Sequence, residues 1–229
     1  NLGGSEARNE GVRAAKGEYL AFLDDDDEFR PEKTAAQMAL MLKDGLDMSF
    51  SDFKLVADDG RVMDYRHFED IPAFDRDSLF KYHMLRHMTG TSTFMYRAEA
   101  LRRIGGFQKA ATGQEFYLMQ RTIEQGLKIG YLPGDYITAH YHDEGRISSG
   151  SGKIRGENAL YEFKKGYFDR LTPRERRFVR FRHHAVLTVV HLRDRQILPM
   201  LGAATMMCLT SPGDVIRERS EEHTSELQS

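Results

Sequence analysis

A short apolar run that ends directly in four aspartates constrains this chain more than any other feature of its sequence. Residues 18–23 read EYLAFL, which is typical of a buried strand, and Asp24, Asp25, Asp26 and Asp27 follow without a break. Four adjacent carboxylates repel one another, so folding them together is unfavourable unless a cation lies close by. The ligands of α/β sheets bind beyond the carboxyl ends of the strands. The junction therefore predicts an α/β fold with a ligand site at this edge of its sheet.

Asp24 and Asp26 are the candidate metal ligands within the acidic run. They alternate along an extended backbone, so both side chains can point the same way. Two such carboxylates can hold Mg²⁺ or Mn²⁺ and leave coordination positions for phosphate oxygens and water. The alternative is a solvated acidic loop before a helix that starts near Pro31, where the helix dipole favours anions. Asp27, which follows the two candidate ligands, is the candidate cap of the next helix.

Predicted strands and helices alternate along the first 150 residues, which is typical of an α/β layer. A turn at 58–60 predicts a hairpin, and the Gly/Ser-rich residues 148–152 predict a boundary. The segment 154–208 is expected to be helical, with breaks near Pro173 and Pro199. The expected helices are 6–16, 31–43, 74–88, 98–104 and 115–126, and the expected strands are 18–23, 47–56, 61–65, 91–96, 128–132 and 138–141.

Composition and charge exclude several classes of protein. Lys and Arg number 33 against 35 Asp and Glu, which disfavours a globally basic nucleic-acid-binding protein. The single cysteine, Cys208, excludes an intrachain disulfide framework and fits a reducing compartment. No apolar run reaches the ~18–20 residues that span a bilayer, and residues 1–5 lack the pattern of a signal peptide. The expected location is therefore the cytoplasm.

Four motifs follow one another in an order that resembles glycosyltransferase family 2. The first covers 5–27, with SEARNEG, AKGEY and FLDDDD. The second is FMYR at 94–97 with IGGF at 104–107. The third runs from GQEFYL at 113–118 to GLKIGYLP at 126–133, and the fourth joins His142 to RIS at 146–148. Each motif alone is weak, and together they cover residues 2 to 148.

This resemblance implies a GT-A fold, which is a Rossmann-like, mixed sheet flanked by helices. It also implies transfer of a sugar from a nucleotide diphosphate with inversion at the anomeric carbon. The family's D-x-D motif falls on Asp24-Asp25-Asp26. Asp26 is then the main metal ligand and Asp24 supports the nucleotide or the metal, while Asp25 takes the variable middle position beside the donor.

Three further residues gain candidate roles from the resemblance. Arg8 is expected to steady the diphosphate as a bidentate cation, with an ion pair to a nearby carboxylate as the alternative. Glu115 is the candidate general base, although family members usually show Glu-Asp where this chain has Gln114-Glu115. The alternative for Glu115 is an acidic residue favoured by the helix dipole. His142 is a candidate contact of the metal or the diphosphate, with a structural or surface histidine as the alternative.

The ends of the chain differ from the family pattern. The family's opening strand, of the V-S-V-I-I-P-x-Y-N type, and a second βα unit are absent. An incomplete donor site, an exposed sheet edge and weak activity are therefore expected. Residues 219–229, RSEEHTSELQS, resemble a translated sequencing adapter. The expected organisation is a partial GT-A domain at 1–150, a helical extension at 151–218 and an artefactual tail at 219–229.

A basic segment lies in the expected helical extension. Residues 164–184 hold eight Lys and Arg against two acidic residues, with aromatic residues between them. One interpretation is an interfacial patch that brings the protein to anionic lipid and a lipid-linked acceptor at the inner face of the membrane. The other is a solvated helix face whose aromatic side chains pack inward. A nucleic-acid partner is not expected, because no recognised binding motif accompanies the patch.

The leading functional hypothesis is a metal-dependent, inverting glycosyltransferase of hexosyltransferase type in cell-surface polysaccharide or glycoconjugate synthesis. Its partners are a nucleotide-sugar donor and a glycan or lipid-linked acceptor. A sugar nucleotidyltransferase is the second hypothesis, but it needs a Gly-rich pyrophosphate loop that residues 1–5 are too short to form. A non-catalytic, sugar- or partner-binding pseudo-transferase is the third.

Overall fold

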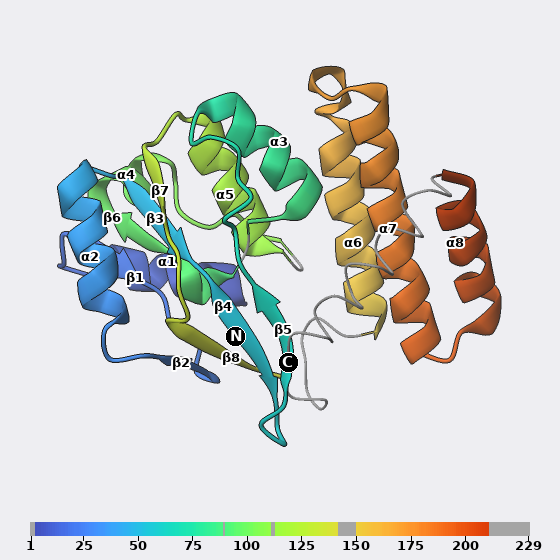
Figure 1. The fold of residues 1–229 in the computed structure, drawn as a ribbon, viewed down its shortest axis with the longest axis horizontal. Helices are drawn as coiled ribbons and strands as arrows, with labels where there is room; N and C mark the ends of the chain where they lie inside the picture. Colours follow the sequence, from blue (N-terminus) through green and yellow to red (C-terminus); the bar gives the residue numbers. More distant parts are fainter. Residues whose placement is uncertain (1–2, 89, 111–112, 142–149, 211–229) are drawn as a thin grey trace. The chain divides into compact units, whose positions relative to one another are not determined.

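The computed structural model describes residues 3–88, 90–110, 113–141 and 150–210. The chain divides into two compact units, residues 1–146 and 147–229. The first contains α-helices and β-strands and the second contains helices (Figure 1). The expected α/β class, with mixed sheets flanked by helices, is confirmed. The domain limits at 150/151 and 218/219 stay a prediction, and residues 219–229 lie outside the described residues.

The described strands of the first unit form two four-stranded sheets instead of one. The first sheet has the order β1-β6-β3-β7. Its strands are β1 (Tyr19–Ala21), β6 (Met95–Arg97), β3 (Met48–Ser51) and β7 (Ile129–Leu132). The strand β6 is antiparallel to both β1 and β3, whereas β3 and β7 are parallel. Among the described strands, β1 and β7 are the two edges of this sheet, and each pairs with one neighbour.

The second sheet carries the acidic run at one of its edges. It has the order β2-β8-β4-β5. Its strands are β2 (Asp27–Phe29), β8 (Ile137–Tyr141), β4 (Phe53–Ala57) and β5 (Val62–Arg66). The strand β8 is antiparallel to β2 and parallel to β4. The expected hairpin is confirmed, because β4 and β5 pair in antiparallel fashion around the turn at 58–60.

Five helices pack around these sheets. They are α1 (Gly4–Ala14), α2 (Lys33–Asp44), α3 (Arg76–Arg86), α4 (Ala98–Arg103) and α5 (Gln114–Glu124). Helix α2 packs on β3 and β7, α4 packs on β6, and α3 packs on α5. Every residue of β3 is buried, and α5 is buried along most of its length. The long apolar face of α5 explains why its position was predictable from periodicity.

Two expectations about the acidic run and the next strand were wrong. Asp27 does not cap a helix, because it begins β2 and its carboxylate accepts a hydrogen bond from the Ser92 hydroxyl. The expected strand 47–56 is two strands in different sheets, divided at Asp52. The buried Asp52 carboxylate accepts hydrogen bonds from the Tyr131 hydroxyl at 2.6 Å and the Gly134 amide at 2.7 Å. These bonds hold the chain where it passes from one sheet to the other.

Local differences appear at three other places. Residues Thr91–Thr93 form a 3₁₀ turn, so the strand expected at 91–96 begins only at Met95. Helix α1 begins at Gly4, two residues before the expected start, and the Ser5 hydroxyl donates to the Gln108 carbonyl. Pro199 lies in the first turn of a helix, where proline is tolerated, and the break expected there falls at residues 194–196.

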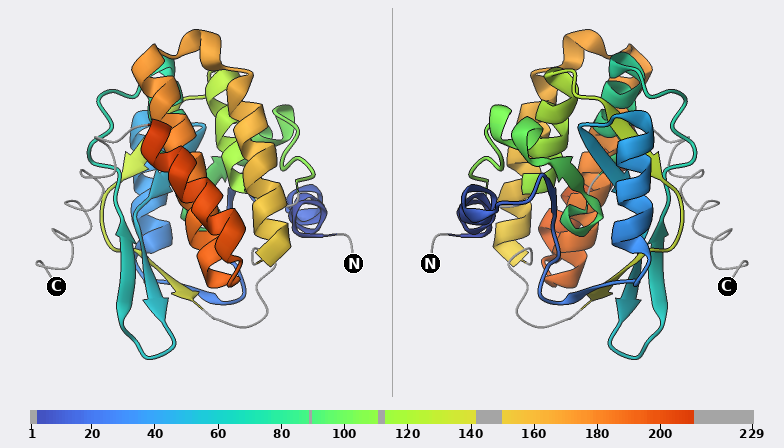
Figure 2. Two further views of the ribbon diagram at one scale, coloured as in Figure 1. Left: turned by 90° about the vertical axis from the view of Figure 1, so that its right-hand side faces the viewer. Right: turned by 90° about the vertical axis from the view of Figure 1, so that its left-hand side faces the viewer.

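The second unit is a row of three helices. They are α6 (Gly150–Lys165), α7 (Pro173–Arg193) and α8 (Ile197–Thr210), with a short 3₁₀ turn at Phe168–Arg170. Helix α7 packs against both α6 and α8 (Figure 2). Its start is fixed by a reciprocal pair of bonds, in which each of Thr172 and Glu175 binds the other's backbone amide. No helix in the described part of the chain is long and apolar enough to cross a bilayer.

Candidate functional site

The loop between β1 and β2 holds Asp24, Asp25 and Asp26, and Asp27 begins β2, beside the 3₁₀ turn that precedes β6. The Asp24 amide donates to the Ser92 hydroxyl at 3.4 Å, and that hydroxyl donates to the Asp27 carboxylate. Ser92 is buried, whereas Asp25 and Asp26 are exposed. One buried serine therefore holds both ends of the acidic loop, while its middle points toward solvent.

Negative charge accumulates at this loop. Burial raises the pKa of the Asp27 carboxyl, the Ser92 hydrogen bond opposes that effect, and the charges of Asp24 and Asp26 raise it further. The charges of three carboxylates therefore act on one another at the end of β1. A cation bound at this loop would relieve the repulsion.

Arg8 joins the acidic loop to the start of α5. One terminal nitrogen of its guanidinium donates to the Asp24 carboxylate at 2.5 Å, and the other donates to the Gln114 side-chain oxygen at 3.1 Å. Both Arg8 and Asp24 keep part of their side chains open to solvent, at 26% and 38%. The alternative expected for Arg8, an ion pair with a nearby carboxylate, is observed. Its role toward a diphosphate stays a prediction.

Glu115 follows Gln114 in the first turn of α5 and is half-buried. The start of this helix contacts His83 of α3. The His83 ring stacks on the Phe116 ring with 4.0 Å between centroids, and its Nε2 lies 3.0 Å from the Phe116 carbonyl oxygen. The backbone that carries the candidate base is therefore anchored to α3. Through Gln114 it is also connected to Arg8 and the acidic loop.

Asn9 joins helix α1 to the segment after α4 through two hydrogen bonds. Its side-chain amide donates to the Phe107 carbonyl at 2.7 Å, and its side-chain oxygen accepts from the Phe107 amide at 2.8 Å. Gly106 has φ +63°, and a Cβ built there would lie 2.5 Å from the Asn9 side-chain oxygen. The Asn of SEARNEG and the Gly-Phe pair of IGGF, which belong to different motifs, are therefore in direct contact.

Lys33 is a buried cation that the sequence did not indicate. It is fully buried at the start of α2, its ammonium lies 3.9 Å from the centre of the Phe29 ring, and it has no hydrogen-bond partner in the described structure. Burial lowers the pKa of this ammonium to about 7. Phe29 and Asp27 belong to the same face of β2, since they are two residues apart on one strand.

The structure thus brings some of the expected site residues together and not others. Arg8 and Asp24 are in direct contact, and Glu115 is adjacent to the Gln114 that Arg8 binds. Asp25 and Asp26 lie on the exposed part of the loop, and His142 lies outside the described residues. The sequence did not single out Gln114, Ser92 or Lys33. For Gln114, the departure from the family's Glu-Asp pattern was the available signal.

Comparisons with known proteins agree with this arrangement. Residues 1–105 match the family described as "Glycosyl transferase family 2". TuaG of Bacillus subtilis, named as a teichuronic acid biosynthesis glycosyltransferase, is 38% identical over 64 residues, which are 28% of this chain and 25% of TuaG. An uncharacterised glycosyltransferase of Methanocaldococcus jannaschii is 26% identical over 133 residues, which are 58% of this chain and 45% of that protein. The chain thus spans less than half the length of these relatives.

A solved structure shares the fold. It is residues 1–349 of S. aureus TarS in complex with UDP-GlcNAc, with a TM-score of 0.53 and 16% sequence identity over 88% of this chain and 70% of that one. This likeness shows the GT-A fold. The order of the four motifs, the matched segment and the fold agree, and residues 1–105, somewhat less than half of this chain, match glycosyltransferase family 2.

Proposed function

We propose that this chain is part of a metal-dependent, inverting glycosyltransferase. The enzyme transfers a hexose from a nucleotide-diphosphate sugar to a hydroxyl group of a glycan or lipid-linked acceptor, in cell-surface polysaccharide synthesis at the inner face of the membrane. One observation carries the proposal: Arg8 connects the acidic loop after β1 to the turn of α5 that bears Glu115. The relatives support the class of reaction, since TuaG is named for teichuronic acid biosynthesis and TarS was crystallised with UDP-GlcNAc.

The acidic loop suits a divalent cation. Its ligands would be carboxylate oxygens, which Mg²⁺ and Mn²⁺ prefer, and the mutual repulsion that acts on Asp27 favours a bound positive charge. No three His, Cys, Asp or Glu side chains of the described residues gather into a complete metal site. The proposed ligands are Asp26 and Asp24, and phosphate oxygens and water would supply the other ligands. When bound, the cation neutralises charge on the leaving diphosphate.

In the proposed reaction, Arg8 and Glu115 have different roles. The Arg8 guanidinium, held in place by Asp24 and Gln114, lies ready to orient the diphosphate with its N–H groups. The Glu115 carboxylate accepts the proton of the acceptor hydroxyl. The acceptor oxygen forms a bond to the anomeric carbon as the bond from that carbon to the phosphate oxygen breaks. The nucleoside diphosphate leaves with that bonding pair, and attack from the opposite face inverts the configuration.

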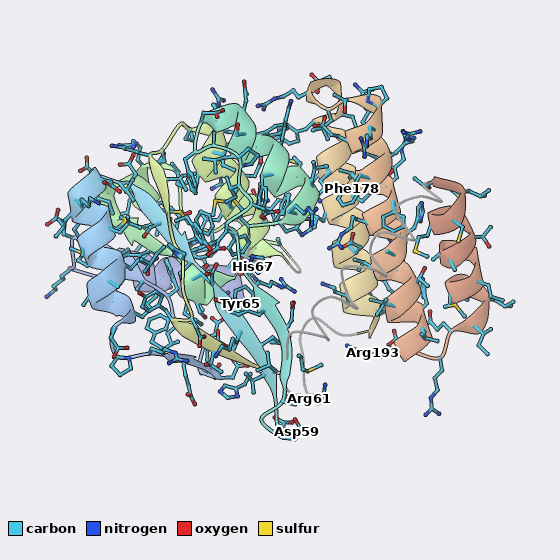
Figure 3. All side chains as sticks on the ribbon, viewed as in Figure 1. Asp59, Arg61, Tyr65, His67, Phe178 and Arg193 are labelled. Atoms are coloured by element: carbon cyan, nitrogen blue, oxygen red, sulfur yellow. The ribbon has the colours of Figure 1, made fainter. Side chains whose placement is uncertain are left out.

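A binding experiment tests the donor site. Thermal unfolding would be followed with UDP and GDP, each with and without Mn²⁺, on this chain and on the longest natural reading frame that contains it. We expect a rise in the unfolding temperature that needs both the metal and the nucleotide and that is lost in Asp26→Asn. Asp59→Asn, at the exposed tip of the β4–β5 hairpin (Figure 3), is the matched control. A nucleotide shift that is the same without metal and in Asp26→Asn would contradict the proposed metal site.

A second variant separates the transferase from the pseudo-transferase. Glu115→Gln removes the proton acceptor but keeps the size of the side chain, so sugar transfer should fall by about 10²–10⁴-fold while donor binding is retained. Glu99→Gln is the control, since Glu99 is exposed in the first turn of α4. Full transfer activity in Glu115→Gln would remove Glu115 as the base. Donor binding without any transfer by the unmodified protein would favour the pseudo-transferase.

A further inference from the structure

Helix α8 presents a large apolar surface to solvent. Leu198 is 82% exposed, Leu209 is 73% exposed and Ile197 is 66% exposed. Leu198, Leu201, Thr205 and Leu209 recur at spacings of three and four residues, so they form one stripe along the helix. Soluble proteins rarely leave such a continuous apolar stripe uncovered.

The same helix offers almost no polar group to a partner. Its fourteen residues contain no charged side chain. The hydroxyls of its two threonines are turned back to their own helix, with Thr205 donating to the Leu201 carbonyl at 2.8 Å and Thr210 donating to the Met206 carbonyl at 2.6 Å. A protein–protein interface carries about one hydrogen bond per 100–200 Å². A surface without free donors and acceptors matches hydrocarbon better than another protein.

The helical unit that carries this apolar surface has an excess of positive charge. Residues 150–210 contain twelve Lys and Arg against five Asp and Glu, whereas residues 1–146 contain nineteen against twenty-five. The overall charge of −2 is therefore the sum of a basic helical unit and an acidic first unit. Arg193, the last residue of α7 (Figure 3), is exposed, and so is Arg195 in the connection that leads into α8, with Asp194 between them. Leu192 and Ile197, both exposed, flank these arginines.

We propose that the outward face of α8, together with the arginines at the α7–α8 connection, binds the surface of an anionic lipid bilayer. A helix of 14 residues extends about 21 Å, which is shorter than the ~30 Å hydrocarbon core of a bilayer. The helix therefore lies along the interface, with its leucines among the acyl chains and the arginines at the lipid phosphates. The inference rests on the helical unit alone, so failure of the proposed transferase activity would leave it standing.

Vesicle binding tests the proposal on the full chain. We expect the protein to float with phosphatidylcholine vesicles that contain phosphatidylglycerol, to bind pure phosphatidylcholine less, and to be released in part by high salt. The double variant Leu198→Glu/Leu209→Glu should bind about tenfold more weakly, because it places charge on the stripe. The matched control is Leu42→Glu, which changes a leucine that is 61% exposed on α2.

A second readout keeps the test decisive if the double variant fails to fold, which circular dichroism would show. Cys208 is the single cysteine of the sequence and is exposed on α8, so an environment-sensitive dye can be attached there. We expect a blue shift of its emission with anionic vesicles. No shift, or equal vesicle binding by wild type and the folded double variant, would overturn the proposal. A dimer in analytical ultracentrifugation that the double variant abolishes would also overturn it, because a second copy would then cover the face.

Discussion

At the scale of single residues, Lys33 shows how strongly burial acts on a charge. Its ammonium has lost water and, among the described residues, has no hydrogen-bond partner, while the Phe29 ring centre lies 3.9 Å away, so burial lowers its pKa to about 7. The unfolded chain, with a pKa near 10.5, binds more protons than the folded chain between pH 7 and 10.5. Stability should therefore rise as the pH rises through this range, and the full cost of burial is present below pH 7.

Lys33→Met removes this charge and keeps an unbranched side chain of similar length. We expect the free energy of unfolding at pH 7 to increase by about 1–4 kcal/mol, since an apolar replacement of a buried ion is often stabilising. The increase in stability from pH 7 to 9 should also become smaller. Urea unfolding at several pH values measures both effects. Lys43→Met, at an exposed position of the same helix, is the control. A loss of stability in Lys33→Met alone would show that the ammonium is favourably bound.

Arg8 depends on the shape of its side chain as well as on its charge. Its two terminal nitrogens bind Asp24 and Gln114 separately, which a lysine ammonium on a flexible stem reproduces poorly. We expect Arg8→Lys to weaken nucleotide-sugar binding about tenfold, and to change the free energy of unfolding by less than about 1 kcal/mol. Calorimetric titration and thermal unfolding check these expectations. Arg13→Lys is the matched control on α1, because Arg13 pairs with Glu6 and Glu10 in solvent. Equal donor affinity in Arg8→Lys would contradict the bridging role.

At the scale of elements, individual side chains fasten helices to distant segments. Asn9 binds both backbone groups of Phe107, and Arg121 of α5 donates to the carbonyl oxygens of Ile104 and Gly106. Helices α1 and α5 therefore hold the same turn between them. This common attachment brings Arg8 of one helix to Gln114 of the other.

Asn9→Asp tests this attachment. The aspartate can still accept from the Phe107 amide, but it cannot donate to the Phe107 carbonyl and it repels that oxygen. We expect a loss of about 1–3 kcal/mol in the free energy of unfolding, measured in urea, since a part-buried carbonyl is left without its donor. Asn158→Asp, at an exposed position of α6, should change stability by less than about 0.5 kcal/mol. Equal losses in the two variants would show that the effect comes from charge alone.

At the scale of the whole molecule, the chain divides into two compact units, each of which has its own network of internal contacts. In the second unit, hydrogen bonds between Thr172 and Glu175 cap the start of α7. In the first unit, Asn9 joins α1 to the backbone of Phe107. We expect Thr172→Ala to cost about 1 kcal/mol, and to speed amide exchange only within α6, α7 and α8. Asn9→Asp should speed exchange only within the first unit. Hydrogen exchange followed by mass spectrometry measures both variants. Faster exchange throughout the chain in either variant would show one cooperative unit.

The sequence by itself determined the features that depend on neighbouring residues. The apolar run 18–23 contains β1, the turn at 58–60 joins β4 to β5, and Gly45 ends α2 in a left-handed conformation. Periodicity and end signals act within a few residues, so they can be recognised without knowing the fold. The order of the four motifs indicated the resemblance to the family for the same reason, because each motif is a local pattern.

Only the tertiary structure decided which residues meet. Arg8 and Gln114 are separated by 106 positions, and the Ser92 hydroxyl that holds the acidic loop is 65 positions from Asp27. The chain crosses from one sheet to the other at Asp52 because its carboxylate binds Tyr131 and Gly134, about eighty residues later. Such contacts depend on how whole elements pack, and no spacing in the sequence encodes them. The metal ligands and the general base stay predictions, because their roles also depend on a bound donor.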